Sequence, residues 1–151
     1  MVTSANAHGS ILGIQPGTRF LQFASYTFDN SLEEMFTTLS WGGCVCIPSE
    51  EQRMNNLAKA INELNANFMD LTPTVANLLN PSDVPTIKSM VLGGEALTKS
   101  VIDRWGTAVH LHGMYGPSEA SSKYALPRER IYKARRLLRL PFHNSPPEIN
   151  S

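Results

Sequence analysis

Seven consecutive residues, Met114 to Ala120, carry several kinds of chemistry in one short stretch. Tyr115 offers an aromatic face on which a flat base can stack. Gly116 and Pro117 force a turn, because glycine tolerates positive φ and proline fixes its own φ. Ser118 is a hydroxyl donor suited to a phosphate oxygen, and Glu119 is a hard oxygen ligand suited to Mg²⁺. The alternative is a surface turn with a buried tyrosine.

Two further stretches carry small or polar residues directly after apolar runs. They are Phe28-Asp29-Asn30 and Gly93-Gly94-Glu95, and residues 108–111 form a similar apolar run ahead of Met114. Open α/β sheets bind ligands at the carboxyl ends of their strands, and parallel strands place those ends on one edge. We therefore expect the three stretches to converge.

The elements that position these stretches follow from apolar periodicity and turn residues. Five strands with helices between them predict an α/β fold, a partial doubly wound and mainly parallel sheet flanked by helices. The expected strands are Arg19–Tyr26, Cys44–Ile47, Asn67–Leu71, Thr86–Leu92 and Val109–His112. The expected helices are Ser4–Ile14, one capped by Ser31 that ends at Trp41-Gly42-Gly43, Leu57–Leu64, Val75–Leu79, and one capped by Thr98 that ends at Trp105.

Helical spacing also predicts which faces of two helices are buried. In the first helix the apolar face contains Ala7, Ile11 and Ile14. In the helix after Ser31, Glu33 and Glu34 fall in the first turn, where the helix dipole favours acids. Its expected buried stripe consists of Leu32, Met35, Phe36 and Leu39.

A chain of 151 residues is long enough for one domain with a real core. No apolar run is long enough to cross a bilayer, and the first residues do not form a secretory signal. The two cysteines, Cys44 and Cys46, have neither redox-pair nor zinc spacing. We expect two buried thiols and a cytoplasmic location.

The charge balance changes along the chain. Up to Ser122 there are six basic and eleven acidic residues, and from Lys123 there are seven basic and two acidic. Residues 130–140 can form a basic helix for an anionic membrane or nucleic acid, or they are a tail without selected function. We favour the second reading, and expect no nucleic-acid partner. Residues 141–151 have the composition of a disordered segment.

Residues 1–122 resemble an internal piece of the adenylation domain of fungal nonribosomal peptide synthetases, within the AMP-forming acyl- and aminoacyl-adenylate family. Four stretches carry the resemblance in order and spacing: residues 22–31 (QFASYTFDNS), 71–74 (LTPT), 91–97 (VLGGEAL) and 115–121 (YGPSEAS). Residues 123–151 depart from the family. The resemblance implies the large subdomain of an AMP-forming synthetase.

The resemblance also implies an activity. The family activates an amino acid with Mg²⁺ and ATP, releases pyrophosphate, and passes the acyl group to a phosphopantetheinyl carrier protein. Asp29 would hold the α-ammonium, and Asn30, Glu33, Asp70, Val91, Gly93, Met114 and Ser122 would line the side-chain pocket. Gly94, Glu95, Tyr115 and Gly116 would meet the nucleotide. Ser118 and Glu119 would be catalytic, with Ser118 on the α-phosphate and Glu119 on the metal.

Each of these residues has a simpler interpretation. Asp29 would then be only a helix N-terminal acid, Glu33 a solvated acid, and Val91 and Met114 ordinary core residues. Gly93 and Gly94 would form only a strand-to-helix turn. Asp70 is the hardest to dismiss, because a buried unpaired carboxylate is costly. It either faces a pocket, or is protonated or hydrogen-bonded.

The chain departs from the family in other respects. Gly113 stands where the family usually has an asparagine that contacts adenine. The 151 residues hold no phosphate loop with its lysine before Thr18, no later ribose-binding aspartate and no C-terminal subdomain. Since the reaction depends on charge neutralisation, we expect the 151 residues alone to be inactive as an adenylating enzyme.

Three functions remain open at this stage. The first is a piece of an adenylating synthetase, working with carrier and condensation domains. The second is a non-catalytic nucleotide- or amino-acid-binding module whose basic tail finds a partner or membrane. The third is a truncated product without function. An acidic pocket with Asp29, Asn30, Glu33 and Asp70 would suit a basic or polar amino acid.

Overall fold

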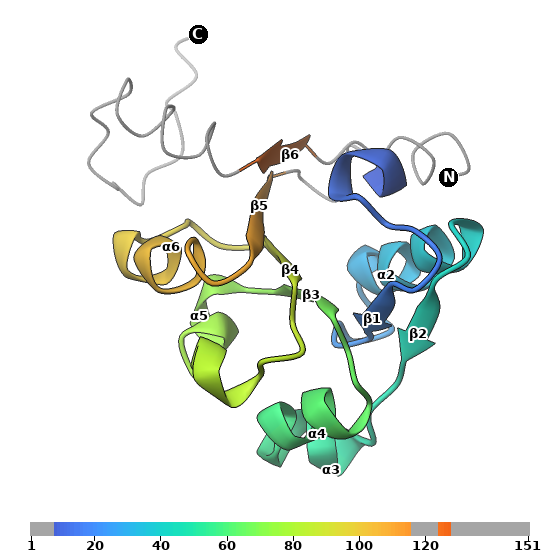
Figure 1. Ribbon diagram of the computed structural model, residues 1–151, viewed down its shortest axis with the longest axis horizontal. Helices are drawn as coiled ribbons and strands as arrows, with labels where there is room; N and C mark the ends of the chain where they lie inside the picture. The colour runs from blue at the N-terminus through green and yellow to red at the C-terminus, as the bar shows by residue number, and fades with distance from the viewer. Residues whose placement is uncertain (1–7, 116–123, 128–151) are drawn as a thin grey trace, which may run out of the picture.

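A computed structural model describes residues 8–115 and 124–127 of the protein. The described residues form a six-stranded sheet in the order β2-β1-β3-β4-β5-β6, with helices in the connections (Figure 1). The strands are β1 (Arg19–Leu21), β2 (Cys44–Cys46), β3 (Phe68–Leu71), β4 (Ser89–Leu92), β5 (His110–Tyr115) and β6 (Tyr124–Pro127). The helices are α2 (Asp29–Ser40), α3 (Glu50–Asn55), α4 (Leu57–Glu63), α5 (Pro73–Ala76), α6 (Lys99–Trp105) and the 3-10 turn η1 (Pro81–Asp83).

The sheet is parallel from β2 to β5, which confirms the predicted α/β fold. The sequence pattern did not predict β6, which pairs antiparallel with β5, Met114 opposite Ala125. The expected domain boundary at Ser122 lies outside the described residues and stays a prediction, as do the expectations for residues 128–151. Within the part of the chain that the structure describes, no helix is long and apolar enough to cross a membrane.

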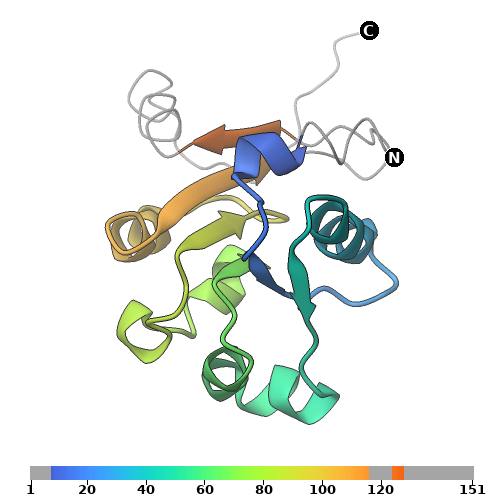
Figure 2. The same ribbon diagram turned by 45° about the vertical axis from the view of Figure 1, so that its right-hand side comes forward.

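Alternating residues of the strands bury opposite faces of the sheet. One face contains Leu21, Met69, Leu71, Met90 and Leu92, packed against residues of α4, α5 and α6 that include Ile61, Ala76, Ile102 and Trp105. The other face contains Phe20, Phe68 and Val91, packed against Leu12 and Ile14. The Phe20 and Phe68 rings stack with centroids 4.6 Å apart. Figure 2 shows α6 and α2 on opposite sides of the strands.

Several helices begin at side-chain caps. The Thr98 hydroxyl accepts from the Val101 N–H, as predicted for α6, and Thr72 caps α5 in the same way. Ser49 and Gln52 form a capping box that starts α3, a helix that the sequence analysis did not predict. These caps fix where the chain leaves the sheet after β2, β3 and β4.

The structure corrects the predicted burial of two helices. Residues 8–12 are helical, but Ile11 is 54% exposed whereas Leu12 and Ile14 are buried. In α2 the buried residues are Ser31, Glu34, Thr37 and Thr38, not the predicted apolar stripe. Phe36 and Leu39 are 56% and 58% exposed, and Leu32 and Met35 are partly exposed. The reason is that the N–H groups of Phe23 and Ala24, in the loop after β1, need an acceptor, which Glu34 provides and an apolar side chain could not.

Three smaller predictions were also wrong. β1 ends at Leu21 instead of Tyr26, because the backbone beyond Gln22 binds a side chain of α2 rather than a neighbouring strand. Met114 and Tyr115 belong to β5 and not to the turn that follows it. Both cysteines are free, but Cys44 is exposed, because β2 lies at the edge of the sheet.

Candidate functional site

A hydrogen bond between two predicted pocket residues joins the first turn of α2 to β3. Asn30, in the first turn of α2, donates from Nδ2 to Asp70 Oδ2 at 3.0 Å. Asp70 lies within β3 and is 8% exposed, so its carboxylate is buried and hydrogen-bonded. Asp29 is the residue before Asn30 and is exposed at the amino-terminal, positive end of the α2 dipole. The fold therefore brings Asn30 and Asp70 into contact, and Asp29 precedes Asn30 directly in the chain.

Glu33 is paired rather than solvated. Its carboxylate lies 2.6 Å from His8 Nδ1, and the Glu33 side chain is only 17% exposed. His8 belongs to the helical residues 8–12, which the ion pair ties to α2. The interpretation of Glu33 as a solvated acid is thus wrong, and its charge is balanced whenever His8 is protonated.

Glu34 is buried and receives several hydrogen bonds from the loop after β1. The N–H of Phe23 donates to Oε2 and the N–H of Ala24 to both carboxylate oxygens, each at 3.2 Å. Gln22 Nε2 also donates to Oε2 at 3.2 Å. Burial, together with the nearby Asp70 charge, raises the pKa of Glu34 to about 8, although the hydrogen bonds oppose this rise.

Gly93 and Gly94 bring the ends of β4 and β5 close together. A Cβ at Gly93 would lie 3.3 Å from both the Cβ and the carbonyl oxygen of Met114, so any side chain there would press on β5. Gly94 has φ of +77°, which favours glycine. The predicted pocket residues Gly93 and Met114 are therefore in direct contact.

Glu95 joins this edge to the start of α5. Its Oε2 accepts from the Thr74 hydroxyl at 2.6 Å and from the Thr74 N–H at 3.1 Å. The hydrogen bond from the Thr74 side chain lowers the pKa of the Glu95 carboxyl. The loops after β3 and β4 are thus joined where the sequence predicts contact with a nucleotide.

Val91 belongs to the core on the α2 side of the sheet, fully buried among Leu12, Ile14, Phe20 and Phe68. Met114 packs against the same cluster and is partly exposed. Val91 lies opposite Asp70 in the β3–β4 register. Val91 is therefore a core residue of the strand next to the one that carries Asp70.

Several predicted site residues are outside the described structure. Gly116, Ser118, Glu119 and Ser122 fall there, and only the backbone of Tyr115 is described, in β5. Among the described residues, no group of three histidine, cysteine, aspartate or glutamate side chains could hold a metal ion. The predicted Mg²⁺ ligand Glu119 thus stays a prediction.

Sequence reasoning missed the roles of Glu34 and His8. Glu34 was assigned only the role of a first-turn acid favoured by the helix dipole, in a helix capped by Ser31. The usable signal was the spacing from Asn30 to Glu34, four residues apart on one face of a helix that begins at Asp29. His8 had no local signal, because its contact with Glu33 is made by the fold.

Comparison with known proteins adds independent evidence. The AMP-binding enzyme family matches residues 1–140. Nonribosomal peptide synthetase 4 of Gibberella zeae is 55% identical over 121 residues, which are 80% of this chain and 2% of that protein. The chain therefore spans a small fraction of the curated relative that it matches.

Two solved structures have the same fold. A nonribosomal peptide synthetase protein containing adenylation and PCP domains, PA1221, superposes with a TM-score of 0.61 at 25% identity, over 75% of this chain and 21% of that chain. O-succinylbenzoate coenzyme A synthetase of Bacillus subtilis, in complex with ATP and magnesium ion, gives a TM-score of 0.73 at 19% identity, over 87% and 29% of the two chains.

Proposed function

Because this chain belongs to the AMP-binding enzyme family, we propose that it forms the amino-acid site and part of the nucleotide site of an adenylation domain in nonribosomal peptide synthesis. The observation that carries this proposal is the Asn30–Asp70 hydrogen bond of 3.0 Å beside Asp29. It gathers carboxylate and amide groups from two separate elements at the sheet edge where α/β proteins bind ligands.

The proposed reaction has two steps. The substrate carboxylate attacks the α-phosphorus of ATP, the bond to the β-phosphate oxygen breaks, and aminoacyl-AMP and pyrophosphate form. The thiol of a phosphopantetheinyl carrier protein then displaces AMP and takes the acyl group as a thioester. Asp29 holds the substrate α-ammonium by a charge-assisted contact, which orients the carboxylate for attack.

The nucleotide and metal are assigned to the strand ends on the β4–β5 side. Gly94, Glu95, Tyr115 and Gly116 meet the nucleotide, and Ser118 contacts the α-phosphate. The positive φ of Gly94 supports close approach of a ligand to this backbone. Glu119 holds Mg²⁺, which when bound neutralises charge on the phosphates.

Because the matched region is only 2% of the Gibberella zeae synthetase, we propose that these residues act within a larger enzyme that supplies the phosphate loop. Carrier and condensation domains are the proposed partners. Asn30, Asp70 and the other pocket residues select the amino-acid side chain.

The test is amino-acid-dependent exchange of pyrophosphate into ATP. We would measure the 151-residue chain and a hybrid in which the chain's residues replace the matching 121-residue segment of the Gibberella zeae synthetase. The chain alone should show background exchange, and the hybrid should respond to at least one amino acid.

Asp29→Ala in the hybrid should lower kcat/KM for that amino acid by roughly 100-fold, because it removes the group that orients the carboxylate. Asp103→Ala, an exposed acid on α6, is the matched control and should have little effect. A hybrid that binds ATP but shows no exchange with any amino acid would favour the binding-module alternative.

A further inference from the structure

The loop between β1 and α2, residues 22–28, begins in the core, where Gln22 is buried and Phe23 packs against apolar residues, and then continues at the surface. Tyr26 and Phe28 in this loop are 65% and 64% exposed, so their rings do not anchor it in a core. Its first residues are fixed by the Gln22 N–H, which donates to the Cys46 carbonyl at 2.8 Å. The loop ends at Asp29, so its position sets the position of the proposed amino-acid site.

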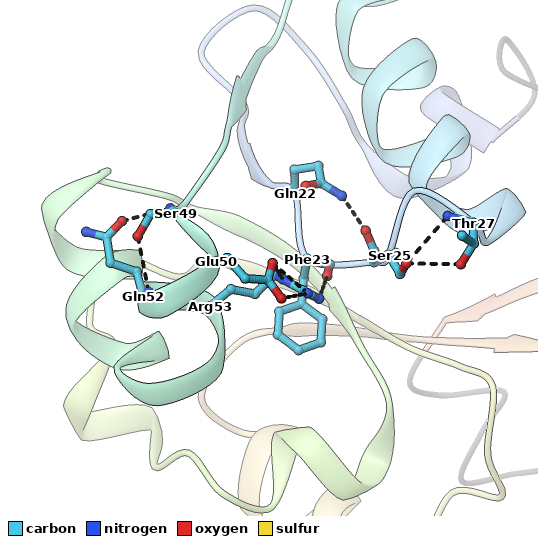
Figure 3. Close-up of polar contacts among 9 residues, drawn as sticks. Gln22, Phe23, Ser25, Thr27, Ser49, Glu50, Gln52 and Arg53 are labelled. Atoms are coloured by element: carbon cyan, nitrogen blue, oxygen red, sulfur yellow. Dashed lines mark hydrogen bonds and ion pairs between the residues drawn. The ribbon is translucent and has the colours of Figure 1, made fainter.

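Two residues from different helices hold the peptide group between Phe23 and Ala24. Glu34 of α2 accepts from the Ala24 N–H, and Arg53 of α3 donates from Nη1 to the Phe23 carbonyl at 3.1 Å. Arg53 is itself fixed by Glu50, which accepts from Nη2 at 2.6 Å and from Nε at 3.1 Å (Figure 3). The Arg53 guanidinium also lies 5.8 Å from the centre of the Phe23 ring.

A short series of contacts connects this peptide to the site. The hydroxyls of Ser25 and Thr27 share a hydrogen bond of 3.0 Å, and the Phe28 N–H donates to the Ser25 carbonyl at 2.9 Å. The Ser31 hydroxyl donates to the Phe28 carbonyl at 2.7 Å. Only residues 25–28 separate the anchored Ala24 from Asp29, so a displacement of the anchor is transmitted over a few bonds.

We propose that Glu34 and Arg53 are positioning residues that set the place of Asp29 and Asn30 relative to the bound amino acid. The proposal rests on the proposed function, because the substrate is the reference for that position. Neither residue needs to touch the substrate. Their effect is predicted on amino-acid binding and not on the nucleotide, whose proposed contacts lie on the β4–β5 side of the sheet.

Arg19 provides a matched control for Arg53. It also donates to backbone carbonyls, from Nε and Nη2 to Leu64 at 3.1 and 2.8 Å and from Nε to Asn65 at 3.1 Å. Arg19 begins β1, at the opposite end of the strand from the loop. Lysine at either position keeps the charge and loses the guanidinium's several fixed donors, so both substitutions remove comparable contacts.

The functional test compares Arg53→Lys with Arg19→Lys in the hybrid synthetase. Arg53→Lys should raise KM for the amino acid by roughly 10-fold, because a small displacement of the site weakens binding strongly, and change KM for ATP less than twofold. Arg19→Lys should lower the Tm by a similar amount and move neither KM. If Arg53→Lys moves neither KM, or moves both equally, the positioning role is refuted.

A second measurement uses the 151-residue chain itself and does not depend on catalysis. Amide hydrogen exchange of residues 23–31 should become faster in Arg53→Lys and remain unchanged in Arg19→Lys, when the two variants have equal overall stability. Equal exchange in both variants would overturn the proposal. An inactive parental hybrid would instead refute the proposed function, so the two failures are distinguishable.

Glu34→Gln tests the second anchor. The amide keeps the size of the side chain but replaces one acceptor oxygen, which meets the N–H of Phe23 or Ala24, by an NH₂ donor. Because the folded protein holds the pKa of Glu34 at about 8, we expect the selective rise in the amino-acid KM above pH about 8, where Glu34 is ionised, together with loss of the pH dependence that this ionisation gives to that KM. The facing groups are Asp70 of β3, which is the nearby charge, and the neutral loop donors. A Glu34→Gln enzyme with an unchanged KM and pH profile would contradict its role.

Discussion

The helices that cover the two faces of the sheet bury side chains of different polarity. On the face covered by α4, α5 and α6, buried side chains such as Ile61, Ile102 and Trp105 make apolar contacts. The other face also carries an apolar cluster, but α2 on that side buries polar residues: Ser31, Glu34, Thr37 and Thr38. Apolar burial is the dominant stabilising term in folding, whereas buried polar groups are costly unless their hydrogen bonds are well made. Apolar burial therefore stabilises both faces, and the second face differs in also burying the polar side chains of α2.

The largest expected effect is on the apolar face. Trp105 is fully buried, and its indole N–H donates to the Ala76 carbonyl at 3.1 Å. Trp105→Ala should lower the free energy of unfolding by about 3–5 kcal/mol, because it leaves a cavity between α6 and the sheet. Urea denaturation measures this. Leu78→Ala, at an 80% exposed position, is the control and should change little. A Trp105→Ala loss below about 1 kcal/mol would remove the distinction between the faces.

The polar face should show its own pH dependence. Unfolded Glu34 ionises near its ordinary pKa of 4.5, but the folded protein holds this pKa at about 8. Between these values unfolding releases a proton, so the stabilising contribution is complete below pH about 4.5 and is lost as the pH rises through about 8. The loss should amount to a few kcal/mol, an order of magnitude set by linkage. Denaturation at several pH values should show a flatter profile for Glu34→Gln; identical profiles would contradict this.

Close packing joins the first helical residues to α2. A Cβ on Gly9 would lie 2.0 Å from Nε1 of Trp41, so the indole lies directly against the glycine. Gly9→Ala should lower the free energy of unfolding by about 1–3 kcal/mol, because the ring must move. Gly13 has φ of +70°, and no atom lies within 4 Å of a Cβ added there. Gly13→Ala therefore measures the cost of backbone strain alone, for comparison with the overpacking caused by Gly9→Ala. A Gly9→Ala protein with the parental Tm would show that the Trp41 ring shifts without cost.

The smallest effect is expected on the outer side of α2. Phe36 and Leu39 are more than half exposed, so replacing both with serine should change the free energy of unfolding by about 0.5 kcal/mol or less. The same change should reduce self-association in analytical ultracentrifugation, because it removes exposed apolar surface. If the double variant unfolds instead, the stripe predicted from the sequence is buried after all.

The fold was predictable because its strands and helices have strong local signals. The buried runs of β3 and β4, the Thr98 cap and the α6 positions Val101, Ile102 and Trp105 all lie where apolar periodicity places them. α2 was mispredicted because periodicity assigns the apolar side of a helix to the core. Here Glu34, Thr37 and Thr38 face the sheet, since the loop after β1 offers backbone donors that an apolar side chain cannot satisfy.

The candidate site was predictable in part. The structure brings Asn30 of α2 to Asp70 of β3 and Gly93 to Met114, so the expected convergence of these residues is confirmed, and their binding roles stay predictions. The pairing of His8 with Glu33, and the anchoring of Phe23 by Arg53, join segments that are distant in the chain. Neither has a spacing that a single sequence reveals.

The arrangement of α2 bears on how such a site can change over generations. In α2, Asn30 donates a hydrogen bond to Asp70 of β3, and Glu34, one turn later, accepts hydrogen bonds from the loop after β1. In the proposed function, selectivity and placement reside in separate side chains of α2. Substitutions at Asn30 or Asp70 would then change which amino acid is bound while the loop keeps its position. Substitutions at Glu34 would displace the loop and weaken binding of every amino acid, so Glu34 should vary less in evolution than Asn30.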